Sequence, residues 1–151
     1  MLTAPEKSVG LAESFLKRAL KKESEAEEHL KNLNYAESVS SSQECIELSI
    51  KAMFLLLTAE YPKRHTFKDE EFEALFEKIP DKLRHLDFPR LFLYSKFWGA
   101  FYETAKYGDE RLGVGPEKLF RREEAQLALT HARESRHAAH TLLTHLRSGS
   151  A

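Results

Sequence analysis

The chain has 151 residues, the size of one ordinary domain, and 42% of them are apolar, which is enough for a substantial core. A net charge of −1 excludes the strong basic excess of a dedicated nucleic-acid-binding chain. A single cysteine excludes a disulfide framework, and no window reaches the roughly 18 apolar residues of a membrane span, so we expect one soluble, cytoplasmic domain over residues 1–151, without membrane contact.

The first half of the chain predicts two long helices. In residues 5–31, apolar side chains such as Leu11 recur at spacings of three and four, the pattern of a one-sided helix. Residues 34–60 carry a wider apolar stripe, which indicates burial on more than one side and a central position. On this second helix Glu47 and Lys51 have the i,i+4 spacing of an ion pair, which is weak if exposed.

The second half predicts one short and two long helices. Residues 68–78 form the short amphipathic one, residues 89–106 and 121–146 form the long ones, and a tail of about residues 147–151 is expected to fray. No strand pattern and no internal repeat competes with this interpretation. The prediction is therefore an all-α fold: an antiparallel helical bundle of four long helices and one short helix.

The helix predicted over residues 89–106 is dense in aromatic side chains, which project around most of its circumference. They are Phe92, Tyr94, Phe97, Trp98, Phe101 and Tyr102. One core cannot easily bury a ring on every side of a helix, so a second apolar neighbour is needed. A second copy of the chain is the simplest candidate, and we expect a homodimer.

Several kinds of chemistry are disfavoured. Four of the seven histidines lie on the last predicted helix, and Glu134 and His137 have a Glu-x-x-His spacing, but a bundle di-iron site needs a second such pair, which the sequence lacks. Cys45 sits on a buried helix, where its pKa would be raised, so a structural thiol is favoured over a nucleophile. No phosphate-binding glycine loop follows a strand. No metal and no cofactor are expected.

A polar cluster remains at the end of the aromatic helix, in the stretch AKYGDE. Residues 61–151 hold 16 Lys and Arg against 14 acidic residues, whereas residues 1–60 hold 7 against 10, so an anion site is expected in the second half. The candidate side chains are Lys106, Tyr107, Asp109 and Arg111, with His65 and Arg64 of another loop as neighbours. Cations can neutralise phosphate, Tyr can stack on a base, and Asp can accept a hydrogen bond from a sugar. The alternative is a helix end closed by Gly108 at positive φ.

In order and spacing, four segments resemble the HEPN family (higher eukaryotes and prokaryotes nucleotide-binding domains). YAESVSSSQECIELSIKAMFLL is similar to the family's second helix, YPKRH to its Pro-x-x-His loop, AKYGDE to its Arg-Tyr-Pro-Asp type turn, and REEAQLALTHARE to its final helix. The resemblance implies a dimeric helical domain that binds nucleotide or RNA.

The same resemblance implies a ribonuclease motif that this chain lacks. Active HEPN ribonucleases carry an Arg, four to six residues, and then a His at the turn, and cut RNA without a metal. Here Lys106 stands in place of the Arg, and residues 110–113 contain no His. Arg133 and His140 satisfy the spacing, but they lie midway along the last predicted helix. The departure leaves nucleotide or RNA binding as the preferred hypothesis.

The resemblance also suggests roles and partners. Lys106 and Arg111 would contact phosphate, Tyr107 would stack, Asp109 would orient a sugar or the loop, and His65 would contribute. A nucleotidyltransferase-like protein is the suggested partner, in a toxin-antitoxin pair. Two alternatives stay open: a metal-independent ribonuclease toxin that uses the variant turn, and a non-catalytic protein-interaction module.

Overall fold

The structure, a computed structural model, describes residues 1–149; residues 150 and 151 of the predicted tail lie outside the described part. The all-α prediction is confirmed, because within residues 1–149 no strand forms beyond one isolated bridge, Asp109 to Val114. The elements in chain order are α1 (Ala4–Lys31), α2 (Tyr35–Thr58), α3 (Asp69–Glu77), the 3-10 helix η1 (Asp81–Leu86), α4 (Phe88–Gly99), α5 (Tyr102–Tyr107), the 3-10 helix η2 (Pro116–Lys118) and α6 (Arg122–Arg147).

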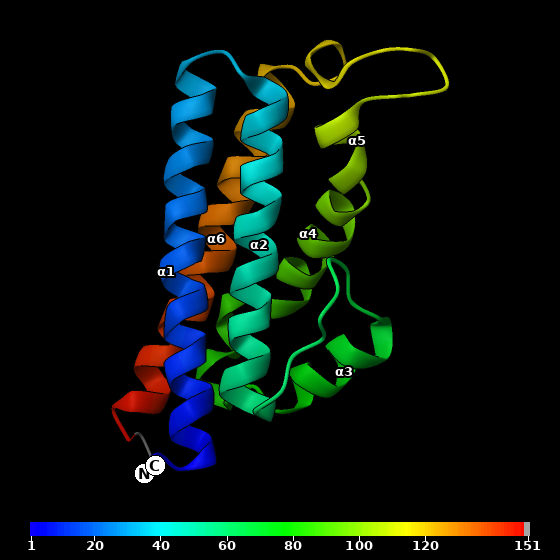
Figure 1. Cartoon of the computed structure of the whole chain (residues 1–151). Helices are drawn as coiled ribbons and strands as arrows, with labels where there is room; N and C mark the ends of the chain where they lie inside the picture. The colour runs from blue at the N-terminus through cyan, green and yellow to red at the C-terminus, as the bar shows by residue number, and fades with distance from the viewer. Residues whose placement is uncertain (150–151) are drawn as a thin grey trace.

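The helices form the predicted antiparallel bundle. In Figure 1, α1 runs upward, α2 returns beside it, α4 and α5 climb again, and α6 descends along α1 and α2. The short α3 contacts α2 and α4 near the lower end of the bundle in Figure 1. The connection after α5 projects from the upper end of the bundle. Within residues 1–149, none of the helices combines the length and the apolar character that crossing a bilayer requires.

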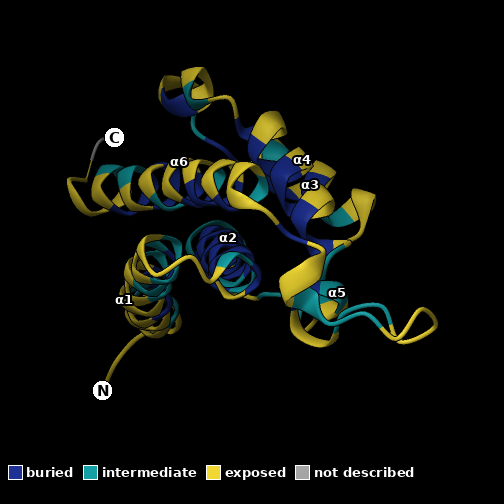
Figure 2. Ribbon diagram, turned by 90° about the horizontal axis from the view of Figure 1, so that it is seen from above, coloured by how far each residue is buried: buried dark blue, intermediate teal, exposed yellow. Residues whose placement is uncertain are grey.

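Helix α2 is the centre of the fold, as predicted. Figure 2 shows α2, most of which is buried, between α1, α6 and α5. Three serines, Ser38, Ser42 and Ser49, are fully buried on α2, and their small side chains let neighbouring helices approach closely. Burial raises the pKa of the Cys45 thiol to about 12, which agrees with a structural role.

The helix predicted over residues 89–106 is broken into two. α4 ends at Gly99, and α5 begins at Tyr102 after Phe101, whose backbone N–H bonds the carbonyl of Trp98 at 3.0 Å, one residue short of the α-helical pattern. A β-carbon on Gly99 would lie 3.1 Å from Cγ2 of Thr66, so a glycine lets the preceding loop pack closely there. After the break, α5 packs against α2.

The chain itself covers most of the aromatic helix. Tyr94 stacks on the His131 ring with 3.7 Å between centroids, and Trp98 Nε1 donates to His131 Nδ1 at 3.0 Å. Phe92 is buried as well, whereas Phe97 remains 49% exposed. The need for a second neighbour is therefore smaller than the sequence suggested, and it is confined to the outer face of α4.

The buried serines of α2 allow a matched test of hydrogen bonding. Ser42 Oγ has no hydrogen-bond partner within the described residues, whereas Ser38 Oγ donates to the carbonyl oxygen of Ala26 at 2.8 Å. We expect Ser42→Ala to raise the free energy of unfolding by about 1 kcal/mol, because it removes an unpaired buried hydroxyl and improves helix propensity. Ser38→Ala should lower it by about 1 kcal/mol. Urea unfolding measures both, and equal losses would contradict the assignment.

Candidate functional site

Three segments bring a polar cluster together beside α2. Glu47 and Lys51 lie one turn apart on α2, His65 comes from the connection after α2, and Tyr102 and Lys106 lie one turn apart on α5. We call these five residues the His65 cluster. Two of its members, His65 and Lys106, belong to the set of site residues predicted from the sequence.

The carboxylate of Glu47 is the centre of the cluster. It lies 3.0 Å from His65 Nδ1 and 2.8 Å from Lys51 Nζ, and it also accepts from Gln43 Nε2 at 3.3 Å. The Glu47 and Lys51 side chains are only 10% and 11% exposed, so the ammonium balances a charge that has left water. His65 is 56% exposed. Because a carboxylate can only accept, Nδ1 carries the proton of the neutral ring, and Nε2 is left with the lone pair.

Tyr102 and Lys106 lie beside the imidazole. The rings of His65 and Tyr102 stack with 4.1 Å between centroids and 20° between planes. Lys106 Nζ donates to the Tyr102 hydroxyl at 3.1 Å and lies 3.5 Å from a carboxylate oxygen of Glu44. The hydrogen bond to Tyr102 raises the pKa of Lys106, with Glu44 adding to the effect and partial burial opposing it. The Lys106 ammonium and the oriented His65 imidazole therefore both contact the Tyr102 side chain.

The connection that carries His65 is anchored on both sides. Arg64 forms a bidentate pair with Glu71 of α3, at 3.1 and 2.7 Å, and also donates to the carbonyl of Thr66 at 3.4 Å. Phe67 is buried and stacks on Phe54. The guanidinium of Arg64, named from the sequence as a neighbour of the candidate site, thus anchors the loop to α3.

The turn after α5 is closed by its own backbone and by one side chain. Asp109 exchanges both backbone hydrogen bonds with Val114, at 2.8 and 3.0 Å, and its Oδ1 accepts from the N–H of Leu112 at 3.1 Å. Gly108 has φ 77° and ψ −157°, a conformation that only glycine adopts readily. The hydrogen bonds of Asp109 fit the turn-forming role among those predicted for it.

The structure divides the predicted site residues into two groups. Lys106 and His65 belong to the cluster beside α2. A separate hollow of about 400 Å³ holds three carboxylates and one guanidinium, a balance that disfavours phosphate. It is lined by Glu103, Thr104, Tyr107, Gly108, Asp109, Glu110 and Arg111.

Sequence reasoning missed Glu47 and Tyr102 as members of a site. The i,i+4 spacing of Glu47 and Lys51 predicts an ion pair, but the strength of that pair depends on its burial, which the spacing does not indicate. The pairing of Glu47 with His65 joins residues 18 positions apart and has no local signal. Tyr102 was counted only as one of the aromatic residues of a core helix.

The other histidine arrangements on α6 have structural partners. Arg133 pairs with Glu23 and Glu27 of α1, at 3.7 and 3.1 Å, and so ties α6 to α1 instead of serving His140. Glu134 accepts the hydroxyl of Tyr94 at 2.6 Å. In the described part of the chain, no three His, Cys, Asp or Glu side chains converge as metal ligands would.

Comparison with known proteins adds two findings. The model of the family described as the HEPN domain matches residues 12–141. The fold is similar to the crystal structure of TT1696 from Thermus thermophilus, with a TM-score of 0.67 and 19% identity, over 87% of this chain and 97% of that one. At that identity the likeness concerns the fold alone. Among curated proteins, none matches the chain.

The turn after α5 should be sensitive to Gly108. A β-carbon there would overlap the carbonyl oxygen of Val114, whereas Gly113, also at positive φ, faces open space. We expect Gly108→Ala to lower the opening free energy of the turn by at least about 2 kcal/mol, and Gly113→Ala by about 1 kcal/mol. Hydrogen exchange of the Asp109 and Val114 amides measures this opening. Equal effects would contradict a steric requirement at Gly108.

Proposed function

Because this chain belongs to the HEPN domain family, we propose that it binds RNA or a nucleotide, and that the His65 cluster provides the main contact. The observation that carries the proposal is the junction of three segments at Tyr102, whose hydroxyl accepts from the Lys106 ammonium and whose ring stacks on the half-exposed His65 ring. An ammonium attracts a phosphate, and the Nε2 lone pair of the imidazole can accept a hydrogen bond from a ribose hydroxyl.

The residues of the turn take secondary roles in this proposal. Tyr107 is 65% exposed and offers a ring on which a base can stack. Arg111 is exposed but shares its hollow with three carboxylates, so it would be only a weak second contact for phosphate. Asp109 keeps the turn in shape. Binding would then extend from the His65 cluster towards the projecting connection.

We also propose a homodimer and a partner. Leu93 and Phe97 lie one turn apart on α4 and are both exposed, which supports an apolar contact with a second copy. Family resemblance supports a nucleotidyltransferase partner in a toxin-antitoxin pair. A non-catalytic interaction module is the alternative if no nucleotide or RNA binds.

One observation favours a second function, cleavage of RNA without a metal. The carboxylate of Glu47 orients His65 so that Nε2 can accept a proton. In such a reaction Nε2 would take the proton of a ribose 2′-hydroxyl, whose oxygen would attack the phosphorus and expel the 5′-oxygen, and that oxygen would be protonated by the imidazolium. Lys106 would stabilise the phosphate charge.

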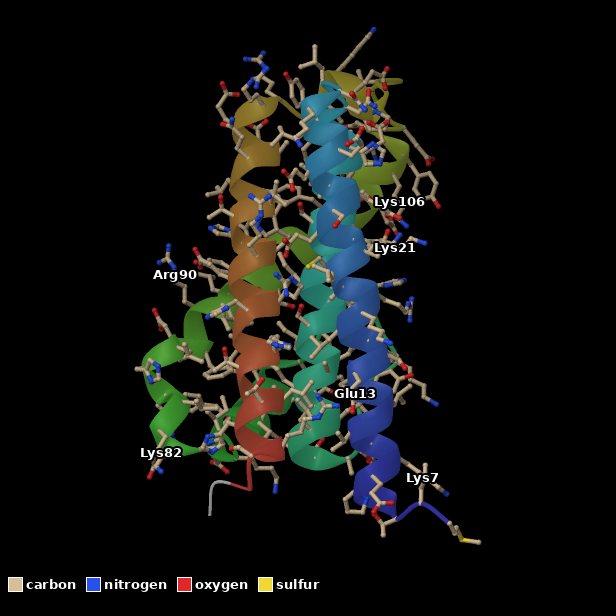
Figure 3. The ribbon with its side chains drawn as sticks, turned by 90° about the vertical axis from the view of Figure 1, so that its left-hand side faces the viewer. Lys7, Glu13, Lys21, Lys82, Arg90 and Lys106 are labelled. Carbon is tan, nitrogen blue, oxygen red and sulfur yellow. The ribbon has the colours of Figure 1, made fainter. Side chains whose placement is uncertain are left out.

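Binding can be tested by fluorescence anisotropy with a labelled single-stranded RNA and with ATP. We expect Lys106→Ala to weaken RNA binding and to reduce the salt slope of log K by about 1, since one phosphate contact is lost. Lys82→Ala, on η1 and far from Lys106 in Figure 3, is the matched control.

The outcomes separate the sites and the hypotheses. If only Arg111→Ala weakened RNA binding, the binding site would be assigned to the turn after α5 and not to the His65 cluster. Undetectable binding of RNA and ATP, with a nucleotidyltransferase that co-purifies, would replace the proposal with an interaction module.

Cleavage is tested by incubating the protein with RNA in EDTA. We expect His65→Gln to slow cleavage by at least roughly 100-fold, because it removes the proton acceptor. Glu47→Gln should slow it less and alter the pH dependence of the rate, while His140→Gln on α6 serves as the control. If the unmodified protein leaves RNA intact under all conditions, the proposal of RNA cleavage is rejected, whereas the proposal of RNA binding still stands.

A further inference from the structure

A second hollow lies at the opposite end of the bundle. It opens between the start of α1 and the end of α2 and has a volume of about 630 Å³, within the range of roughly 300–1,000 Å³ typical of small-molecule sites. Figure 3 shows Lys7, one of its lining residues, at the N-terminal end of α1, while Lys106 lies further up the bundle. We call this hollow the α1–α2 groove.

The wall of the groove is largely apolar. It is formed by Leu11 of α1, Leu55 and Ala59 of α2, and the ring of Tyr61, which packs edge-on against Phe15. Leu11 belongs to the apolar stripe of the first helix and yet is 41% exposed, and it lines the groove. An apolar surface of this kind gains free energy when a ligand covers it.

The charge on the groove favours an anion. Lys7 and Lys63 both line it, and within residues 1–149 neither ammonium has a carboxylate partner, whereas Glu60 supplies one carboxylate. The carbonyl groups at the end of α2 would add negative charge, but hydroxyls partly satisfy them. Ser8 Oγ donates to the carbonyl of Ala59 at 3.4 Å, and Thr58 Oγ1 bonds the carbonyl oxygen of Glu60 at 2.8 Å.

We propose that the α1–α2 groove binds a small amphipathic anion: an apolar body against Leu11, Leu55 and Tyr61, and a carboxylate or phosphate head at Lys7 and Lys63. The lining combines an apolar wall with a few polar groups that orient a ligand, as in small-molecule sites generally. This inference does not depend on RNA binding.

The groove is connected to the His65 cluster through one side chain. Lys51 Nζ lies 5.8 Å from the centroid of the Tyr61 ring and 2.8 Å from the Glu47 carboxylate that holds His65. Tyr61 is also only four residues from His65 in the same connection. A ligand that moves the Tyr61 ring therefore acts on the groups that orient His65.

Calorimetry with two probes of equal chain length tests the site. Decanoate and decyltrimethylammonium, each below its micelle concentration, carry the same apolar chain and opposite head charges. We expect one decanoate per chain and at least roughly tenfold weaker binding of the cationic probe. The Lys7→Gln, Lys63→Gln double variant should lose this preference, and Leu11→Asn should weaken both probes by roughly fivefold or more. Lys17→Gln and Lys82→Gln are the controls.

Histidine and tyrosine ring signals in NMR spectra locate the bound probe. We expect decanoate to shift the signals of Tyr61 and His65 and to leave those of His140 on α6 unchanged. Equal affinity for both probes, shifts spread over the whole protein, or an unchanged affinity in the Leu11→Asn variant would overturn the proposal. So would a dimer, measured by sedimentation, that Leu11→Asn converts to monomer, because the groove would then be an interface between copies. Thermal unfolding verifies that each variant is folded.

Discussion

Helix α2 is enclosed by α1, α6 and α5, so a charge carried on its buried faces must be balanced inside the chain. Glu47 carries such a charge, and Lys51 and His65 are the groups that balance and hold it. Removing a carboxylate from water costs several kcal/mol unless partners replace the lost solvation. The chain after α2 returns to bring His65 to this carboxylate, and α5 closes over it with Tyr102. The balance of one buried charge thus sets the position of the candidate site.

Neighbours in sequence serve different surfaces in this arrangement. Successive residues on a helix point about 100° apart, so Lys106 faces α2 while Tyr107 faces solvent. Arg111 and the three carboxylates near it line a hollow at the turn that does not include Lys106. The Lys-Tyr-Gly-Asp sequence therefore contributes side chains to two different surfaces.

The spacing of apolar residues predicted where the long helices lie and that α2 is central, because a buried stripe is a local pattern in the sequence. It did not predict the break after Gly99, where the chain packs closely against Thr66 of another segment. Nor could it show that His131 would cover Tyr94 and Trp98, since that contact joins α6 to α4. Residue types identified His65 and Lys106 as site candidates. The Glu47 carboxylate that orients His65, and the Tyr102 ring that contacts both His65 and Lys106, could be identified only from the tertiary structure.

The buried pair of Glu47 and Lys51 also constrains how this protein can diverge. Replacing Glu47 alone leaves the mostly buried Lys51 ammonium without its carboxylate, and replacing Lys51 alone leaves Glu47 with only His65 and Gln43 as partners. Breaking a buried pair by removing one partner typically costs about 3–5 kcal/mol. Positions 47 and 51 are therefore expected to change together among relatives, and position 65 to follow them. A relative with apolar residues at positions 47 and 51 would lack the carboxylate that orients an imidazole at position 65, even if it kept the same fold.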